Sequence, residues 1–320
     1  MSKFILEFEK PIKIIEEQIN NLKITSSTTN INVDDKLNEL YDKLNQEYVK
    51  VYSNLTRWQK VELARHNDRP HTTDYIKMIS EDWIELHGDR KFSNDPSIIS
   101  GIAKINNESF VIIGNEKGRG TKDKLYRNFG MAKPEGYRKA LRVMKLAEKF
   151  KIPIVTFIDT PGAYPGIGAE ERGQAQAIAD NLFTMSTLQV PIISRVIGEG
   201  ASGGALAIGL ADKLLCLENT WYSVISPEGC ASILFHDTTK AQDAANSMKV
   251  SSDDLLEMGI ADSIINEPLG GAHNNYSEMS DIIKQVILKE TKKLKALTVD
   301  ELVSSRMKKY DKIGVFDLND

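Results

Sequence analysis

The segment Ile197–Gly209 constrains the fold and chemistry of this chain more than any other stretch. It reads IGEGASGGALAIG and continues from Val190–Ile197, a β-branched run with the length of a buried strand. The small residues and leucine of Ala205–Ala211 favour a buried helix. Four glycines therefore lie where a strand is expected to turn into a helix N-terminus: Gly198, Gly200, Gly203 and Gly204. Because the first N–H groups of a helix have no partner within it, this backbone is suited to bind negative charge.

Two enzyme classes match this segment by pattern. Residues 198–203 fit the dinucleotide pattern G-x-G-x-x-G, and Glu218 lies where an acid that binds a ribose hydroxyl belongs, which would make the chain an NAD-dependent oxidoreductase. Residues 200–204 fit the nucleophile pattern G-x-S-x-G. That match would make Ser202 the nucleophile of a hydrolase, with Asp237 and His273 as its candidate partners.

Two other interpretations of the segment need no reactive side chain. The N–H groups of Gly203 and Gly204 would suit an oxyanion hole, which stabilises negative charge in a transition state. Small residues also serve the close packing of a helix against a strand. All four patterns are short, so the choice among them depends on the rest of the chain.

Composition excludes several classes of protein. The chain has 320 residues, of which 41% are hydrophobic, enough for one large domain or two small ones. Its net charge of −4 argues against nucleic acid or an anionic membrane as the main partner. Cys216 and Cys230 are its only cysteines, so we expect neither a disulfide framework nor a metal site in this chain. No run resembles a signal peptide or a membrane span, so we expect a soluble cytoplasmic protein.

Residues 1–60 are expected to form a helical hairpin without a core of its own. Apolar residues recur at helical spacing from Ile12 to Leu22 and again from Val33 to Leu55. The polar stretch Thr25–Asn30 between these runs predicts a turn. Such a hairpin has an apolar seam, which we expect either the body of the protein or another subunit to cover.

Strands and helices are expected to alternate through residues 61–275. The expected strands are Ile98–Ile105, Phe110–Gly114, Pro153–Ile158, Val190–Ile197, Leu214–Leu217 and Tyr222–Ile225. The expected helices are Pro70–Phe92, Gly136–Phe150 and Ala169–Met185, with further helical pieces from Pro227 onward. This alternation indicates βαβ units. Residues 276–320 are predicted to form a C-terminal helical segment, with helices over Glu278–Leu297 and Val299–Tyr310 and with Thr298 as an N-cap.

Two further glycine-rich loops follow predicted strands, namely Gly114–Gly120 and Asp159–Gly166. Ligand sites in open α/β folds lie at the carboxyl ends of strands, so three such loops predict one continuous cleft lined by main chain. Tyr164 is a candidate for a flat apolar wall of that cleft. Basic side chains near the loops are expected to add positive charge: Lys117, Arg119, Arg127 and Arg138.

A general base is hard to find in the sequence. All five histidines lie outside the glycine-rich loops, and no phosphate-binding P-loop is present. The chemistry that remains for the cleft is the stabilisation of an oxyanion by backbone N–H groups.

Long, ordered motifs give the chain a specific resemblance to a known family. The motifs are Phe8–Ile12, Asn128–Met131, Pro134–Arg142, Phe157–Gly166, Ala169–Gln174, Ile197–Gly209, Tyr222–Ala231 and Glu267–His273. The chain resembles the carboxyltransferase α subunits of bacterial acetyl-CoA carboxylase over nearly its whole length. This resemblance implies an α/β fold of the crotonase type, a superhelix of ββα units with an added N-terminal helical hairpin and C-terminal helices.

The resemblance also implies a reaction and a set of partners. The family transfers a carboxyl group from carboxybiotin to acetyl-CoA and forms malonyl-CoA for fatty-acid biosynthesis. The biotin carboxyl carrier protein carries the carboxybiotin, and a separate biotin carboxylase makes it. A separate β subunit of the same fold, which carries the zinc, completes an α2β2 heterotetramer. The active site lies between the two subunits, with CoA held mainly by the β subunit and biotin approached by the α subunit.

By this resemblance, the N–H groups of Gly203 and Gly204 would stabilise negative charge on the ureido oxygen of biotin as CO2 is released. The biotin ring would then take a proton from the acetyl methyl group, so no protein base is needed. A chain that served only as a scaffold would instead tolerate substitution of both glycines. The expected substrate-binding residues are Gly118, Arg119, Gly162, Ala163, Tyr164, Pro165, Gly166, Gly200, Ala201 and Ser202.

One residue departs from the family pattern. The family usually has glycine at the position of Ala201. If that position required a positive φ, the alanine would be strained by roughly 1 kcal/mol.

Overall fold

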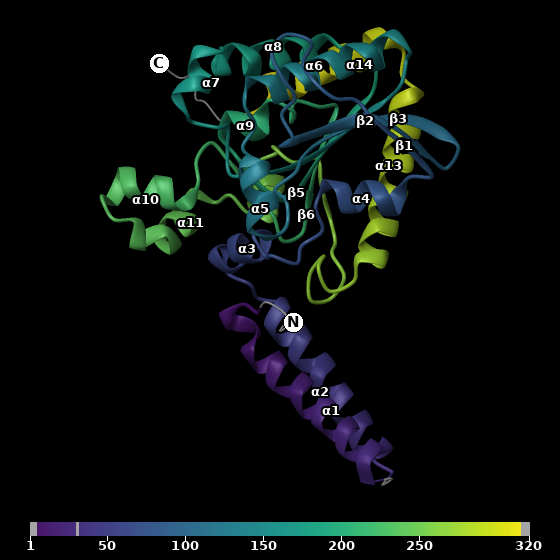
Figure 1. The fold of residues 1–320 in the computed structure, drawn as a ribbon, viewed down its shortest axis with the longest axis vertical. Helices are drawn as coiled ribbons and strands as arrows, with labels where there is room; N and C mark the ends of the chain where they lie inside the picture. The colour runs from purple at the N-terminus through teal and green to yellow at the C-terminus, as the bar shows by residue number, and fades with distance from the viewer. Residues whose placement is uncertain (1–4, 30–31, 315–320) are drawn as a thin grey trace.

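An eight-stranded mixed sheet forms the centre of the computed structural model, which describes residues 5–29 and 32–314 (Figure 1). The strand order is β1-β2-β3-β4-β5-β6-β8, and β7 pairs with β5. The strands are β1 (Asp82–Glu85), β2 (Ile98–Ile105), β3 (Glu108–Asn115), β4 (Ile154–Thr160), β5 (Ile192–Ala201), β6 (Lys213–Leu217), β7 (Trp221–Ser223) and β8 (Ser263–Ile265). The pairs β1–β2 and β2–β3 are antiparallel, whereas all the other pairs are parallel.

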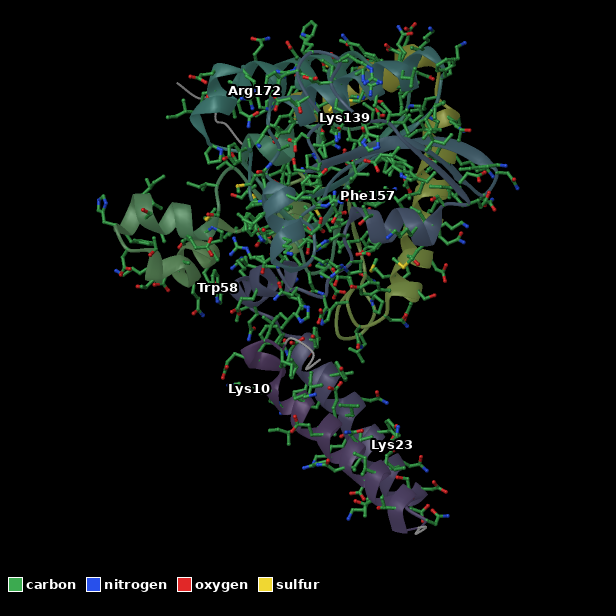
Figure 2. The ribbon with its side chains drawn as sticks, in the orientation of Figure 1. Lys10, Lys23, Trp58, Lys139, Phe157 and Arg172 are labelled. Carbon is green, nitrogen blue, oxygen red and sulfur yellow. The ribbon has the colours of Figure 1, made fainter. Side chains whose placement is uncertain are left out.

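Helices cover both faces of the parallel strands. One face packs against α6 (Pro134–Lys149) and α8 (Gln174–Thr187), and the other against α4 (Thr72–Ile79) and α13 (Tyr276–Lys295). Every residue of β4 and β5 is buried as a result. Double coverage is why these strands have continuous apolar sequences instead of an alternating pattern. Phe157, in the middle of β4, lies at the centre of the body (Figure 2).

Arg306 fastens the helix α14 (Val299–Asp311) to the body. Its fully buried guanidinium donates to both carboxylate oxygens of Asp212, at 2.8 and 2.9 Å. It also donates to three backbone carbonyls between the last turn of α8 and the start of β5: Met185, Leu188 and Val190. All five of its N–H groups are therefore paired, which offsets the high cost of burying the charge.

The N-terminal hairpin projects from the body (Figure 1). It consists of η1 (Glu7–Glu9), α1 (Lys10–Thr29) and α2 (Asp34–Tyr52). Ile12, Ile15 and Ile19 are buried on α1, whereas the described side chains of α2 are half-buried or exposed. The two helices thus cover much of the predicted seam themselves, and the hairpin meets the body at its base. Lys10 and Lys23 lie along its surface (Figure 2).

The turn predicted over Thr25–Asn30 is wrong for its described part, because α1 continues to Thr29. The hydroxyls of Thr25, Ser27 and Thr28 donate to carbonyls three or four residues earlier, which lets polar side chains remain helical. Asn30 lies outside the described residues. So do residues 1–4 of the predicted hairpin and residues 315–320 of the predicted C-terminal segment.

The helix predicted over Pro70–Phe92 is also wrong beyond Ile79, where α4 ends and Ser80 becomes extended. Residues Asp82–Glu85 form β1 instead, with Trp83 opposite Ala103 on β2. Pairing with a distant strand overrides the helical spacing of the apolar residues.

The helix predicted over Ala169–Met185 is interrupted. It divides into α7 (Ile167–Glu171) and α8 at Gly173, whose φ of 81° breaks the helix. The predicted cap of α14 is confirmed, since Thr298 and Glu301 form a capping box. The remaining helices are α3 (Arg57–Ala64), α5 (Gly120–Tyr126), η2 (Asn128–Gly130), α9 (Ser202–Leu206), α10 (Pro227–Phe235), η3 (Thr238–Lys240), α11 (Ala241–Met248) and α12 (Ser252–Glu257). None of the helices in the described part of the chain is both long and apolar enough to cross a membrane.

Candidate functional site

The three glycine-rich loops meet at one edge of the sheet. They follow β3, β4 and β5, which are neighbours and parallel, so their carboxyl ends lie together. The position for a Cβ atom on Gly162 lies 3.9 Å from Cβ of Ser202, so the second and third loops are in contact. The loops meet as expected, and the continuous cleft between them stays a prediction.

The turn from strand to helix lies later than the sequence predicts. β5 runs to Ala201, so Gly198 and Gly200 are strand residues, and the helix that follows is the short α9 in place of a helix over Ala205–Ala211. A Cβ atom on Gly198 would overlap the carboxylate of Asp159. One on Gly200 would lie 2.5 Å from Cδ2 of Tyr222. These glycines therefore allow close packing within the sheet.

This placement contradicts the dinucleotide interpretation. The first glycines of that pattern must form an open turn beside a pyrophosphate, whereas here they face packed side chains. Glu218, the expected ribose-binding acid, accepts a hydrogen bond from the N–H of Glu267. The oxidoreductase prediction is wrong.

The hydrolase interpretation also fails. Ser202 is exposed and has a φ of 61°, as a nucleophile on a strained turn would. Its predicted partners are occupied in other places. His273 faces Glu9 at the base of the hairpin, and Asp237 caps η3. The neighbouring Ala201 is extended, with φ −110° and ψ 140°, so alanine causes no strain there.

Gly203 and Gly204 form the N-terminal turn of α9. No side chain of the described residues caps this helix, and its first N–H groups have no partner within it. Gly203 is half-buried, and Gly204 is buried against Gly162 and Ala163, where a Cβ atom would overlap the backbone. Gly204 thus lies directly on the loop that follows β4.

Tyr164 packs back onto its own loop. Its N–H donates to the carbonyl of Ala132 at 3.0 Å, and its carbonyl accepts from the amide of Gln174 at 2.9 Å. Its half-buried ring covers Gly166, where a Cβ atom would overlap it, while Pro165 is exposed. The loop from Gly162 to Gly166 is therefore held by hydrogen bonds to Ala132 and Gln174 and by the contact of the Tyr164 ring with Gly166.

Arg119 points away from the other predicted site residues. It follows a turn at Gly118, where φ is 77°. The guanidinium donates to Asp74 at 2.6 Å, to Tyr276 and to the carbonyls of Asn67 and Arg69. Two other arginines expected near the cleft are likewise bonded to protein oxygens: Arg127 to Asp123 and Pro96, and Arg138 to Asp89, Glu135 and Arg172. The guanidinium groups of all three arginines are therefore engaged in contacts within the protein.

An ionic network that the sequence analysis missed lies beneath the three loops. Nζ of Lys117 is 2.7 Å from Oδ1 of Asp159 and 2.7 Å from Oε1 of Glu199. Glu199 also accepts from Nε of Arg65 at 2.7 Å. Burial alone would raise the pKa of Glu199, but the charges of Lys117 and Arg65 outweigh it and lower that pKa. The sequence signal that could have indicated this network is an acidic residue near the end of each of two mostly apolar strands, Asp159 in β4 and Glu199 in β5.

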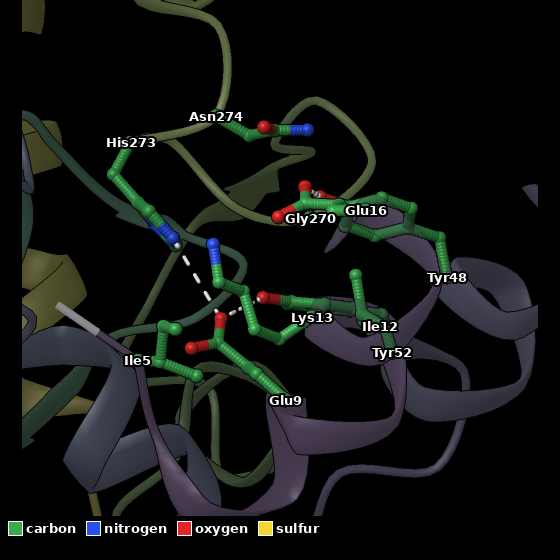
Figure 3. A pocket seen from close by; sticks show the side chains of 10 residues that line it. All are labelled: Ile5, Glu9, Ile12, Lys13, Glu16, Tyr48, Tyr52, Gly270, His273 and Asn274. Atoms are coloured by element: carbon green, nitrogen blue, oxygen red, sulfur yellow. Dashed lines mark hydrogen bonds and ion pairs between the residues drawn. The ribbon is translucent and has the colours of Figure 1, made fainter. Parts of the chain in front are cut away.

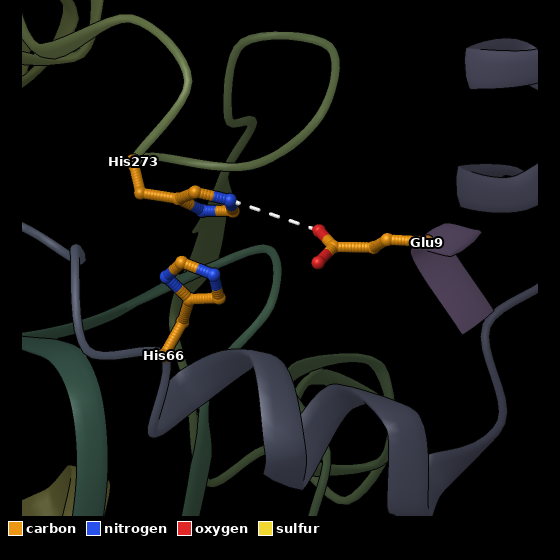
Figure 4. A group of neighbouring side chains, drawn as sticks. All are labelled: Glu9, His66 and His273. Atoms are coloured by element: carbon orange, nitrogen blue, oxygen red, sulfur yellow. Dashed lines mark ion pairs between the residues drawn. The ribbon is translucent and has the colours of Figure 1, made fainter. Parts of the chain in front are cut away.

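A second polar cluster joins the hairpin to the body (Figures 3 and 4). Potential ligand atoms of Glu9, His66 and His273 lie within 4.8 Å of one another. The two imidazole rings, however, stack with centroids 3.9 Å apart and planes 22° apart. An ion bound by histidine lies in the plane of the ring, which nearly parallel, stacked rings cannot share. Glu9 also accepts from the N–H of Leu6 and from the hydroxyl of Tyr52. The cluster is better suited to a hydrogen-bonded joint than to a metal.

A family model described as acetyl co-enzyme A carboxylase carboxyltransferase-like matches residues 5–314 of the chain. The chain belongs to this family. A carboxyltransferase-family relative, the acetyl-coenzyme A carboxylase carboxyl transferase subunit alpha of Geobacter metallireducens, is 50% identical over 315 residues. The match covers 98% of this chain and 99% of that protein.

Two solved structures have the same fold as this carboxyltransferase-family chain. A transcarboxylase 12S chain matches with a TM-score of 0.56 and 18% identity, over 78% of this chain and 44% of that one. A chain of a Pseudomonas malonate decarboxylase hetero-tetramer matches with a TM-score of 0.59 and 14% identity, over 73% of this chain and 91% of that one. The predicted crotonase-type α/β fold is confirmed.

Proposed function

We propose that this chain is the α subunit of an acetyl-CoA carboxylase carboxyltransferase. In this role it transfers the carboxyl group of carboxybiotin to acetyl-CoA and forms malonyl-CoA, the first committed step of fatty-acid biosynthesis. The observation that carries the proposal is the family match over residues 5–314, with half of the residues identical to a curated α subunit. The meeting of three glycine-rich loops at one edge of the sheet supports it.

Gly203 and Gly204 would carry the chemistry. Their N–H groups would donate to the ureido oxygen of biotin, where negative charge builds up as the carboxyl group leaves. Because the donors are fixed before the reaction, they need no reorganisation, and loss of one such donor costs on the order of 10²–10³ in rate. The loops contain no histidine, so we assign the abstraction of the acetyl proton to the biotin ring and not to this chain.

The surrounding loops would bind substrate. Gly162–Gly166 would form the wall on the biotin side, and the end of β5 from Gly200 to Ser202 would form the floor. Gly118 and Arg119 would lie at the margin. Arg119 has the weakest support, since its guanidinium is already bonded to Asp74 and to two carbonyls.

We further propose that a separate β subunit of the same fold completes the site in an α2β2 heterotetramer in the cytoplasm, and that it carries the zinc. Three apolar side chains on the helices around the third loop support a partner there: Ile167, Phe183 and Leu206 are 79%, 77% and 39% exposed. The biotin carboxyl carrier protein would deliver carboxybiotin, and a biotin carboxylase would reload it.

The test is an assay of malonyl-CoA decarboxylation coupled to biocytin carboxylation, for this chain alone and with its β subunit. Replacing Gly204 by glycolic acid converts one amide to an ester and removes the N–H without adding a Cβ atom. We expect activity only in the mixture and a loss of roughly 100-fold in kcat in the ester variant. The same replacement at Gly209, inside the body, is the control. Full activity of the Gly204 ester would contradict the oxyanion hole and favour a scaffold role.

A further inference from the structure

Lys117 is the point where the ends of two central strands are tied together. Its ammonium lies 2.7 Å from Oδ1 of Asp159, at the end of β4, and 2.7 Å from Oε1 of Glu199, near the end of β5. Oδ1 of Asp159 also accepts from the backbone N–H of Glu199 at 3.0 Å. Lys117 itself stands just after β3, so one side chain joins three successive strands.

The backbone around Lys117 is shaped to enclose this bridge. A Cβ atom on Gly130 would lie 2.9 Å from Cγ of Lys117 and 3.0 Å from the carbonyl oxygen of Asp159. On the other side, a Cβ atom on Gly198 would overlap the carboxylate of Asp159. Glycines on both sides leave the ammonium little room to shift, and only 15% of its side chain is exposed.

The network continues beyond β5. Arg65 bonds Oε2 of Glu199 at 2.7 Å and Oε1 of Glu228, in the first turn of α10, at 2.6 Å. The cations Lys117 and Arg65 are thus shared among three carboxylates, so removal of Lys117 would leave Asp159 and Glu199 facing each other without a cation between them.

Stability alone does not explain these buried charges, because packed apolar side chains of similar volume often stabilise a fold as much or more. The backbone pairing of β4 with β5 is irregular between the pairs Ile158–Val196 and Thr160–Gly200, and the ionic bridge spans this stretch. β4 leads after two residues into Gly162, and β5 leads into the turn at Ser202. Gly204 in turn contacts Gly162 and Ala163, so the two segments that leave these strand ends meet each other.

We propose that Lys117 is a positioning residue for carboxyl transfer. By bridging Asp159 and Glu199 across the irregular stretch of pairing, it holds the ends of β4 and β5 in place and thereby holds α9, whose first turn contains Gly203 and Gly204, against the loop that follows β4. This inference rests on the proposed function of those two glycines.

The variant Lys117→Met, assembled with the β subunit, removes the bridge. Lys139→Met is the matched control. Lys139 is another buried lysine, on α6, and it has two oxygen partners: Asn94 Oδ1 at 2.9 Å and the carbonyl of Asp95 at 2.7 Å. We expect both variants to melt at lower temperature. Only Lys117→Met should lower kcat, by roughly 10- to 100-fold with KM for malonyl-CoA within about twofold, since small displacements of reacting groups have effects of that size.

A second variant and a second measurement keep the test decisive. In Lys117→Met/Glu199→Gln the new amide can donate to Asp159 and link the two strands again, so kcat should partly recover. This double variant also has one unpaired carboxylate fewer, so it can be tested even if Lys117→Met folds poorly. Hydrogen exchange of residues 200–206 should be faster in Lys117→Met than in Lys139→Met. Unchanged exchange would overturn the positioning role of Lys117. Faster exchange with unchanged kcat would instead contradict the part assigned to Gly203 and Gly204 in turnover.

Discussion

The backbone of Gly204 packs directly on the amide nitrogen of Ala163, leaving no space for a Cβ atom between them. The adjacent Gly203 differs, because its Cβ position lies 3.4 Å from Cδ1 of Ile178, an ordinary van der Waals distance. Two neighbouring glycines thus meet different requirements. Gly204 has to be glycine for α9 to lie against the loop after β4, whereas Gly203 is not required by packing.

This difference predicts unequal effects of the same substitution. Gly204→Ala should push α9 away from the second loop and lower kcat by about 100-fold, because backbone on backbone cannot yield as a flexible side chain can. Gly203→Ala keeps its N–H group and should retain kcat within about threefold. The coupled decarboxylation assay measures both, and similar losses in the two variants would contradict the packing argument.

Ala201→Gly should lower stability without changing turnover. Ala201 is buried and extended, so it gains nothing from the conformational freedom of glycine, which increases the entropy of the unfolded chain. We expect the free energy of unfolding to fall by about 0.5–1 kcal/mol. Chemical denaturation measures this change, and a stabilised variant would show that the alanine is strained.

The joint of the hairpin should depend on Glu9. Burial by itself would raise the pKa of Glu9, but the neighbouring His273 and the hydrogen bonds from Tyr52 and from the N–H of Leu6 outweigh it and hold the pKa below its ordinary value of 4.5. The contribution to docking is therefore present above about pH 4.5 and is lost as the pH falls through the lowered pKa. Glu9→Gln should speed the proteolysis of α1 and α2 at neutral pH. Glu16→Gln is the control, since Glu16 also accepts from a tyrosine of α2, Tyr48, at 3.1 Å. Equal cleavage of both variants would rule out a special role for Glu9.

Glu116 should make the fold sensitive to acid. Burial alone would raise its pKa, but the hydrogen bond with His71 and the N–H of Thr73 lower it to about 2. Because the pKa of Glu116 is lower in the folded protein than its ordinary 4.5, the ionised carboxylate contributes to the free energy of unfolding above pH 4.5. This contribution is lost as the pH falls toward 2. Between neutral pH and about pH 3 the wild type should lose about 2 kcal/mol more than Glu116→Gln. Urea denaturation at each pH measures the difference, and parallel pH profiles would contradict it.

The central strands could be predicted from the sequence because their coverage by helices leaves a direct trace. Strands buried on both faces need continuous β-branched runs, and the predicted strands Pro153–Ile158 and Val190–Ile197 overlap β4 and β5. The meeting of the glycine-rich loops follows from the parallel order of β3, β4 and β5, and so could be predicted as well.

Other features depend on contacts that local sequence does not encode. Trp83 lies in a strand because Ala103 is its partner, and nothing in the helical spacing near Trp83 specifies that partner. The bridge from Lys117 to Asp159 and Glu199 joins residues 42 and 82 positions apart, and hydrophobic patterns carry no information on which acid meets which base. The family resemblance indicated the glycines but not the charges that hold them.

The contacts of Arg306 also order events during synthesis. The central strand β5 and the carbonyls just before it are made early, yet the guanidinium that binds Leu188, Val190 and Asp212 is added more than ninety residues later. Until then those oxygens have only water as a partner from this direction. The contacts that α14 makes with Asp212 and with the segment before β5 can therefore form only after β5 has been synthesised.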